Sequence, residues 1–289
     1  MSSPAVIGPS PFLKWAGGKR SQLPFLRSHI GQISGRYFEP FLGGGAALFG
    51  LAPSTECFAG DLNSDLIATY ETVRDAPQEL IEIFKDFHNE KEFYLQVRSW
   101  DRDPSFVDRP KVEKAARFIY LNRTGFNGLY RVNSRGEFNV PFGRQSYRTI
   151  ADYENLVKVS QFLKGELQSG TVTLFNGSYL DLCAQAQEGD TVYLDPPYDP
   201  LSASSSFVSY QKDGFTRKDQ EDLRDEVLRL ASIGCKVFVS NSSSEYMHKL
   251  YGDRQLFQIH RVMVPRQIGA QAQSRSSVEE ILVEARNRG

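Results

Sequence analysis

One alternation along the chain restricts its fold more than any other feature. RYFEPF (36–41) predicts a short buried strand, and LGGGAALFGLA after it predicts a glycine turn that opens a helix. TECFAGD (55–61) predicts a second strand that ends in an acid, and Asn63 or Ser64 would cap the helix that follows. This order of strand, glycine turn, helix, strand and acid is typical of nucleotide sites on open α/β sheets.

A helix-rich segment interrupts this α/β pattern and carries a basic stretch. Residues from about 71 to 121 have apolar side chains at helical spacing, and residues 122–148 are rich in Gly, Asn and Arg, which predicts a loop or hairpin. Strands and helices alternate again afterwards, and FQIHRVMV and SSVEEILVEA predict a closing strand pair. We therefore expect a catalytic domain formed by residues 1–70 and 150–289, with residues 71–149 inserted as a recognition domain.

The composition is that of an ordinary globular protein. Of the 289 residues, 40% are hydrophobic and 24% are charged. The N-terminus has no basic start followed by an apolar run, and no stretch reaches the ~18 apolar residues of a membrane span, so neither a signal peptide nor a membrane helix is expected. Cys57, Cys183 and Cys235 form no C-x-x-C pair and no zinc pattern. We expect reduced core thiols in a cytoplasmic protein.

Charge is distributed unevenly although the net charge is only −1. The segment from Lys114 to Arg148 contains seven basic residues and one acidic residue. These bases, nearly all Arg, are interleaved with Phe, Tyr, Asn and Gly, a combination typical of surfaces that bind nucleic acid. A solvated surface is the alternative, since that is the usual role of a charged run. We interpret the segment as a binding surface.

The glycine turn and the acid after the second strand predict a nucleoside site. Asp61 could accept hydrogen bonds from both hydroxyls of a ribose, as the corresponding acid does in dinucleotide sites, or it could only begin the turn before the next helix. The turn reads LGGGAA and not G-x-G-x-x-G, and no second mononucleotide half follows. A cofactor with one nucleoside and no pyrophosphate therefore fits better.

PFLKWAGGKR (11–20) predicts a second part of that site. Trp15 is one of only two tryptophans, and the pair Gly17 and Gly18 lets the backbone approach a ligand closely. Lys19 could meet a carboxylate at the amino-acid end of the cofactor. The alternative is a stray aromatic side chain beside a solvated lysine.

TVYLDPPYDP (191–200) predicts a buried strand that ends in a rigid acidic turn. Each proline fixes φ at roughly −65° and removes a backbone N–H, so Asp195 and Pro196 are held extended. The Asp195 carboxylate and the Pro196 carbonyl are then neighbouring acceptors for the two N–H groups of an exocyclic amine, whose lone pair becomes available when both are held. Tyr198 offers a ring face for stacking. A base in a duplex reaches such a pocket only when it is flipped out.

Read in order, PFLKWAGGKR, FEPFLGGG, the basic insertion and DPPY resemble the Dam-type, D12-class DNA adenine-N6 methyltransferases. The resemblance covers about residues 11–283, and residues 121–143 resemble the family's DNA-recognition hairpin almost without a break. It implies a Rossmann-like α/β methyltransferase sheet with a mostly helical DNA-recognition insertion and hairpin. It also implies S-adenosylmethionine as cofactor, double-stranded DNA as partner, and methylation of a flipped adenine within GATC.

The motifs and the resemblance together assign roles to individual residues, with no metal among the ligands. The expected catalytic residues are Asp195, Pro196, Pro197 and Tyr198. The expected cofactor-binding residues are Trp15, Lys19, Phe41, Gly43, Gly45, Asp61, Tyr179 and Asp195. The expected DNA-binding residues are Lys14, Arg123, Phe126, Asn127, Arg131, Asn133 and Arg144, of which Arg144 matches a phosphate contact.

Three other functions share part of these features. A cytosine-N4 methyltransferase uses the same chemistry, but that group more often has Ser at the position of Asp195. A DNA-binding protein without catalysis is disfavoured by the intact DPPY, Asp61 and Lys19, and a nucleotide-dependent dehydrogenase by the absent pyrophosphate fingerprint. Whether a restriction endonuclease acts on the same site is left open. The Ser-rich stretch 201–215 could be a slack linker, but its place directly after DPPY favours a mobile lid over base and cofactor.

Overall fold

A computed structural model of the protein describes residues 8–143, 149–200, 215–265 and 277–286. By its internal contacts the chain divides into two compact units. Unit 1 comprises Met1–Arg20, Leu42–Glu56 and Gly60–Gly177, and unit 2 comprises Ser21–Phe41, Cys57–Ala59 and Ser178–Gly289. These units reflect packing, and the division by function into a catalytic and a recognition domain stays a prediction.

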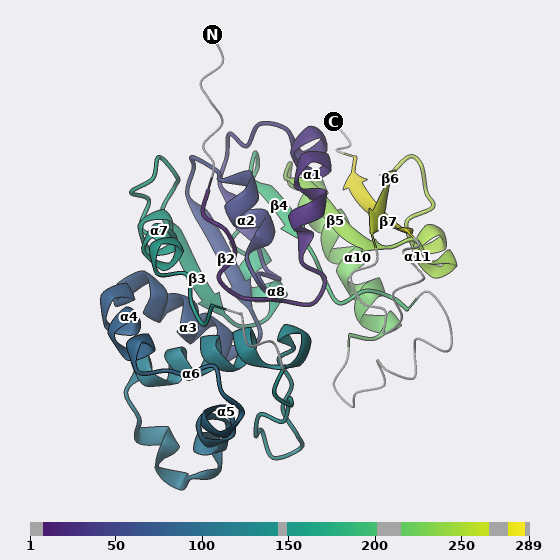
Figure 1. Ribbon diagram of the computed structural model, residues 1–289. Helices are drawn as coiled ribbons and strands as arrows, with labels where there is room; N and C mark the ends of the chain where they lie inside the picture. The colour runs from purple at the N-terminus through teal and green to yellow at the C-terminus, as the bar shows by residue number, and fades with distance from the viewer. Residues whose placement is uncertain (1–7, 144–148, 201–214, 266–276, 287–289) are drawn as a thin grey trace. The chain divides into compact units, whose positions relative to one another are not determined.

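Within the described ranges, seven strands form a sheet of order β3-β2-β1-β4-β5-β7-β6 (Figure 1). They are β1 (Tyr37–Glu39), β2 (Cys57–Asp61), β3 (Val172–Asn176), β4 (Thr191–Leu194), β5 (Lys236–Ser242), β6 (Phe257–Pro265) and β7 (Ser277–Ala285). Strands β2, β1, β4 and β5 pair in parallel, whereas β7 pairs antiparallel with β5 and with β6. Every residue of β1 and β4 is buried, as expected of central strands covered on both faces.

The strand order reverses between β1 and β4, and this switch point positions the predicted motifs. In open α/β sheets, ligands bind beyond the carboxyl ends of the strands at the place where the order reverses. Strand β1 ends at Glu39, shortly before Phe41, and β4 ends at Leu194, directly before Asp195. The strands predicted from the sequence are present, including the closing pair β6 and β7. The predicted Rossmann-like α/β fold class is therefore confirmed.

In unit 1, helix α6 contacts α3, α4 and α5 and is buried along most of its length. Asn63 caps α3 by accepting a hydrogen bond from the backbone N–H of Leu66, as predicted. The predicted helix-rich character of the segment after residue 71 is confirmed. The helices are α2 (Ala46–Leu51), α3 (Ser64–Asp75), α4 (Pro77–Lys85), α5 (Lys91–Arg98), α6 (Lys111–Thr124) and α7 (Tyr153–Leu163), with shorter 3-10 turns η2 (Ser99–Arg102), η3 (Pro104–Asp108) and η4 (Phe126–Gly128).

In unit 2, helix α10 (Arg217–Ser232) packs against β5 and β7. Thr216 and Asp219 begin it with a reciprocal capping box, which satisfies two backbone donors. The other helices are α1 (Leu23–Ile30), preceded by the turn η1 (Lys19–Gln22), α8 (Tyr179–Cys183) and α11 (Glu245–Leu250). All three cysteines are buried and none forms a disulfide, as predicted for reduced core thiols.

Residues 125–142 form an irregular hairpin in unit 1, as predicted, although α6 continues through Thr124 and so makes residues 122–124 helical. Its two arms meet at isolated antiparallel bridges, Gly125 with Phe142 and Val132 with Phe138. Because few ladder bonds form, side chains from the helices take their place. The Asp101 carboxylate, for example, accepts from the N–H of Phe138 at 2.7 Å.

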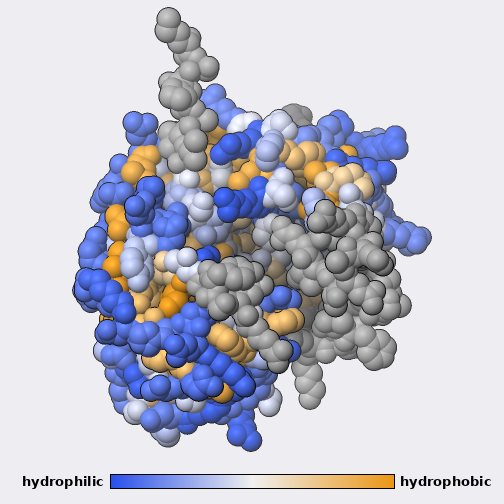
Figure 2. All heavy atoms as spheres, viewed as in Figure 1, coloured by the Kyte–Doolittle hydropathy of each residue, from blue (hydrophilic) through white to orange (hydrophobic). Residues whose placement is uncertain are grey.

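The face of the molecule drawn in Figure 2 is largely hydrophilic, with apolar side chains scattered between polar ones. Such scattered apolar exposure is ordinary for a folded chain. Among the helices that the structure describes, none has the length and apolar character needed to cross a membrane.

Candidate functional site

The acidic turn that follows β4 keeps its tyrosine in a fixed position. The Tyr198 hydroxyl donates to the Glu280 carboxylate on β7 at 2.9 Å, and the side-chain amide of Gln22 donates to the same oxygen at 2.9 Å. Burial, with the nearby carboxylates of Asp195 and Glu280, raises the pKa of Tyr198 well above its ordinary value. The hydroxyl therefore stays protonated and remains a donor to Glu280. Asp195 and Tyr198 are half-buried, Pro196 is buried and Pro197 is exposed.

Phe41, which follows β1, lies against the first residue of α8. The ring centroids of Phe41 and Tyr179 are 5.3 Å apart and the planes are inclined by 28°. Phe215 completes the cluster, with its centroid 5.9 Å from that of Phe41 and 6.4 Å from that of Tyr179. These separations are those of rings in direct contact, so no third ring fits between Phe41 and Tyr179. A nucleobase would have to pack on an outer face of this cluster.

Asp61, at the end of β2, is oriented by the backbone of unit 1. One carboxylate oxygen accepts from the N–H of Gly43 at 3.0 Å and the other accepts from the N–H of Asn63 at 2.9 Å. A carboxylate has about four acceptor positions, so these bonds leave acceptor capacity for a ligand. Burial raises the pKa of Asp61, although the backbone bonds to Asn63 and Gly43 oppose this shift. The residue thus has both predicted functions available, since it starts the turn and keeps acceptor capacity.

The glycine turn needs glycine for steric reasons. Gly43 and Gly45 have positive φ values of 48° and 68°. A Cβ atom on Gly43 would lie 2.6 Å from the Trp15 ring, and one on Gly45 would lie 2.8 Å from the hydroxyl of Tyr70. The predicted site residues Trp15, Gly43, Gly45 and Asp61 are therefore brought together within unit 1.

Trp15 also belongs to an aromatic cluster that reaches the hairpin. Its ring is stacked with Tyr130 at 5.9 Å and with Phe118 of α6 at 6.3 Å. The Tyr130 hydroxyl donates to Asp65 at 2.9 Å. Lys19 is buried, with 2% of its surface exposed, and its ammonium donates to the Gly17 carbonyl at 2.6 Å. Lys19 is thus not the solvated lysine that the sequence offered as an alternative.

Lys14 is fixed to the hairpin by one buried asparagine. The Asn122 side chain accepts from the N–H of Lys14 at 2.8 Å and donates to the Lys14 carbonyl at 2.7 Å. The same amide donates to the Gly128 carbonyl at 3.1 Å. Gly128 has a positive φ of 68°, and a Cβ there would lie 2.5 Å from the Lys14 side chain. Two predicted DNA-binding segments, far apart in the sequence, are therefore held together in unit 1.

The hairpin presents several of the predicted DNA-binding side chains. Phe126 is 50% exposed, and Asn127 adopts a left-handed backbone conformation with φ 55°, which Asn tolerates better than most residues. Arg131 is exposed, and its Nε donates to Asn139 at 2.7 Å. Asn133 is used within the turn, because it accepts from the N–H groups of Arg135 and Glu137 and donates to the Glu137 carboxylate. Its contact with DNA stays a prediction.

Two more predicted DNA-binding residues, Arg123 and Arg144, lie near the ends of the hairpin in the sequence. Arg123 is half-buried and lies near the Thr149 carbonyl, at 3.4 Å. Arg144 lies outside the described residues, and so do residues 201–214 of the predicted lid. Phe215, the last residue of that predicted lid, contacts Phe41 and Tyr179 as described above.

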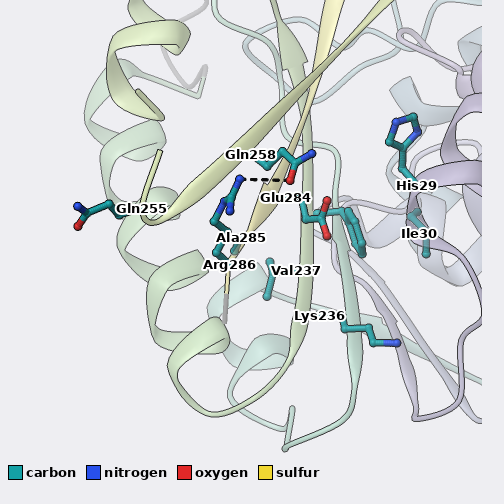
Figure 3. A pocket seen from close by; sticks show the side chains of 10 residues that line it. His29, Ile30, Lys236, Val237, Gln255, Gln258, Glu284, Ala285 and Arg286 are labelled. Atoms are coloured by element: carbon teal, nitrogen blue, oxygen red, sulfur yellow. Dashed lines mark hydrogen bonds between the residues drawn. The ribbon is translucent and has the colours of Figure 1, made fainter. Parts of the chain in front are cut away.

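A pocket of 640 Å³ lies elsewhere in unit 2 (Figure 3). Its labelled lining includes His29, Lys236 at the amino end of β5, and Arg286, which donates to Gln258 at 3.4 Å. None of the residues predicted to bind cofactor or DNA lines it. The pocket lies at the amino-terminal end of β5, whereas Asp195 follows the carboxyl end of β4. Because β4 and β5 are parallel, these positions are at opposite ends of the strands.

Sequence reasoning missed several residues of the site. Glu280, Gln22 and Asn122 act through hydrogen bonds to partners far away in the sequence, so no local pattern marks them. Leu62, directly after Asp61, is 79% exposed. An apolar residue after the strand-ending acid was visible in the sequence, but only the structure shows that it faces solvent.

Comparison with known proteins finds sequence relatives that match nearly the whole chain. Residues 15–268 match the family model described as D12 class N6 adenine-specific DNA methyltransferase. The chain is 43% identical to Type II methyltransferase M1.LlaDCHI of Lactococcus lactis subsp. cremoris, over 94% of each protein. It is 37% identical to Type II methyltransferase M.MjaIII of Methanocaldococcus jannaschii, over 94% of this chain and 98% of that protein.

A third relative is named for its target base. The DNA adenine methylase of Salmonella typhi is 35% identical, over 94% of this chain and 93% of that protein. The family match covers most of the chain, including DPPY, the glycine turn and the hairpin. The chain therefore belongs to the D12 class of N6 adenine-specific DNA methyltransferases.

Proposed function

We propose that the protein uses S-adenosylmethionine to methylate N6 of an adenine flipped out of duplex DNA, within the sequence GATC. The observation that carries this proposal is the acidic turn after β4, at the switch point of the sheet, with its tyrosine held by Glu280. Such a turn offers acceptors for an amine and a ring for a base, but it has no access to a base inside a duplex.

The residues of unit 1 fit a nucleoside cofactor without pyrophosphate. Asp61 keeps acceptor capacity beside a glycine turn that admits no side chain at Gly43. We expect these acceptors to take the ribose hydroxyls, and Trp15 and Gly45 to shape the same site. When bound, S-adenosylmethionine supplies a methyl group on a positively charged sulfur. Lys19 would contribute a buried positive charge for a carboxylate.

In unit 2, Phe41 and Tyr179 would offer an outer ring face to the cofactor's base. Asp195 and the Pro196 carbonyl would accept the two N–H groups of the target amine, which withdraws the nitrogen lone pair from conjugation with the ring. Tyr198 would stack on the flipped adenine. Pro197 would keep the turn rigid.

DNA recognition would use the hairpin and the segment attached to it. Phe126 and Asn127 are exposed at one turn, and Arg131 is exposed further along. The name of the Salmonella relative supports adenine as the target base, and the hairpin resemblance supports GATC. Lys14, Arg123, Asn133 and Arg144 are proposed to contact DNA as well. A partner endonuclease acting on the same site is a further proposal, supported only by relatives named Type II methyltransferases.

Long-read sequencing of DNA treated with the purified protein and S-adenosylmethionine tests this proposal. We expect N6-methyladenine in GATC, and no modification by the Asp195→Ala variant under the same conditions. N4-methylcytosine would overturn the target base. Methyladenine in another sequence would overturn GATC alone, and DNA binding without any modification would indicate a catalytically silent protein.

A further inference from the structure

The backbone of the acidic turn is held by two buried side-chain amides. Pro196 and Pro197 have no N–H, and the turn has left the ladder that β4 forms with β5. Gln220, on α10, donates from its Nε2 to the Pro197 carbonyl at 2.8 Å. Asn241, on β5, accepts with its Oδ1 from the N–H of Asp199 at 3.1 Å.

The two amides also bind each other. Asn241 donates from its Nδ2 to the Oε1 of Gln220 at 3.2 Å, and its Oδ1 accepts a second bond from the N–H of Ser242 at 2.9 Å. Gln220 is 1% exposed and Asn241 is fully buried. Every polar side-chain atom of the pair is thus hydrogen-bonded out of contact with water, where an unpaired amide would be costly.

The geometry fixes both ends of the segment that carries the chemistry. Leu194, the last residue of β4, is paired with Val239 of β5. Two residues further along β5, Asn241 binds Asp199. The four residues between, 195–198, are therefore held between two anchor points on the same strand, and Gln220 restrains the middle of this segment.

We propose that Gln220 and Asn241 are positioning residues for methyl transfer, which fix the acceptors of the acidic turn against the target amine. The inference rests on the proposed function of Asp195, Pro196 and Tyr198. Neither amide would touch the substrate. Their contribution is to hold the turn in the geometry that the reaction needs, where small displacements lower rates strongly.

Asp199 is the alternative anchor for the turn. Its carboxylate accepts from the Ser244 hydroxyl at 2.6 Å and from Arg217 at 3.2 Å. These bonds hold the residue after the turn, but they do not reach the Pro197 carbonyl. Removal of Gln220 alone therefore separates the amide pair from the anchoring by Asp199.

The test compares Gln220→Met with a matched control, Ser240→Ala. Methionine keeps the length and burial of glutamine but removes both hydrogen bonds. Ser240→Ala removes the buried bond between Ser240 and Tyr193, 2.8 Å long and one residue away from Asn241, in which neither Gln220 nor Asn241 takes part. We expect Gln220→Met to lower the single-turnover rate of adenine methylation at least about tenfold, with unchanged affinity for S-adenosylhomocysteine and for DNA. Ser240→Ala should lower the melting temperature similarly and leave this rate unchanged.

A rate for Gln220→Met equal to that of wild type, at a reduced melting temperature, would show that the amides only stabilise the fold. Hydrogen exchange supplies a readout that does not depend on activity. Asp195, Tyr198 and Asp199 have the only backbone N–H groups of the turn. We expect protection of this segment in wild type and in Ser240→Ala, and its loss in Asn241→Ala.

The two readouts separate the inference from the proposed function. A wild-type protein that protects the turn but methylates no adenine would contradict the proposed function. An active wild-type protein whose turn exchanges equally fast in Asn241→Ala and in wild type would overturn the positioning role.

Discussion

At the scale of single residues, Asp61 combines two properties that oppose each other. Its carboxylate is buried enough to raise its pKa, yet backbone N–H groups, those of Asn63, Gly43 and Leu62, favour its charged form. Burial is the largest cause of the raised pKa. The ionised form of Asp61 therefore stabilises the fold less than an ionised carboxylate at a solvated position would. Such a cost is typical of residues that keep acceptor positions for a ligand.

Asp61→Ala should weaken binding of S-adenosylhomocysteine and leave DNA affinity nearly unchanged, because the ribose acceptors are lost and the hairpin is not. Isothermal titration calorimetry measures the first and fluorescence anisotropy the second. If cofactor affinity is the same in both proteins, Asp61 only begins the turn before α3.

The same substitution has a pH-dependent effect on stability. Because the folded pKa lies above the ordinary 3.8, the folded state binds the proton more tightly than the unfolded state. The stability from Asp61 is fully present below pH 3.8 and decreases as the pH rises through the raised value. Urea unfolding measures the free energy of unfolding of wild type and of Asp61→Ala across this range. The value for wild type minus the value for Asp61→Ala should fall as the pH rises. A difference that rises would contradict the raised pKa.

Asp195→Ala should abolish methylation while the protein stays folded, because only one acceptor for the target amine remains. Loss of a charge-assisted hydrogen bond at the transition state costs ~2–4 kcal/mol, a rate decrease of at least about thirtyfold. Single-turnover kinetics with a hemimethylated duplex measures the rate, and circular dichroism serves as the folding control. Turnover within about tenfold of wild type would contradict the mechanism.

At the scale of elements, the hairpin is held by side chains from helices and turns more than by its own ladder. Asp101 binds both Arg117, at 2.6 Å, and the N–H of Phe138. Tyr94, on α5, donates to the Val140 carbonyl at 2.9 Å. The arm that returns to the helices is thus well supported, while Arg131 on the outgoing arm is exposed to solvent.

Arg131→Ala should relax sequence specificity. The bond from its Nε to Asn139 orients the guanidinium, and the two terminal amino groups of an arginine can pair with one guanine edge, worth about 1–3 kcal/mol of discrimination. Binding to GATC duplexes and single-base variants over a range of salt measures this. Arg135→Ala, at the exposed tip of the hairpin, is the control and should keep the ranking of sites. Equal losses on matched and mismatched DNA for Arg131→Ala would show that Arg131 reads no base.

At the scale of the whole molecule, the proposed cofactor should stabilise the fold by mass action. At a concentration of 100 times its Kd, a ligand specific for the folded state adds about 2.7 kcal/mol to the free energy of unfolding. We expect S-adenosylhomocysteine to raise the melting temperature in a concentration-dependent way and NAD to leave it unchanged. A shift with NAD alone would favour the dehydrogenase alternative.

Local sequence patterns were sufficient to predict part of the secondary structure of this protein. Strand β4 and the rigid turn that its following prolines form depend on backbone restrictions that act within a few residues. The glycine turn at Gly43 and the cap at Asn63 do so too. The hydrophobic period likewise predicts the helix-rich segment after residue 71. These features depend on φ, steric contact and hydrogen bonds between near neighbours.

Only the tertiary structure decided which distant side chains complete these motifs. Glu280 reaches Tyr198 across 82 residues, Asn122 reaches Lys14 across 108, and Asn241 reaches Asp199 across 42. A buried polar group must find a partner, but the sequence does not state which one, because the sheet order and register bring the two together. Short motifs therefore predict the chemistry of the candidate site, whereas the packing of segments far apart in the chain determines which side chains support it.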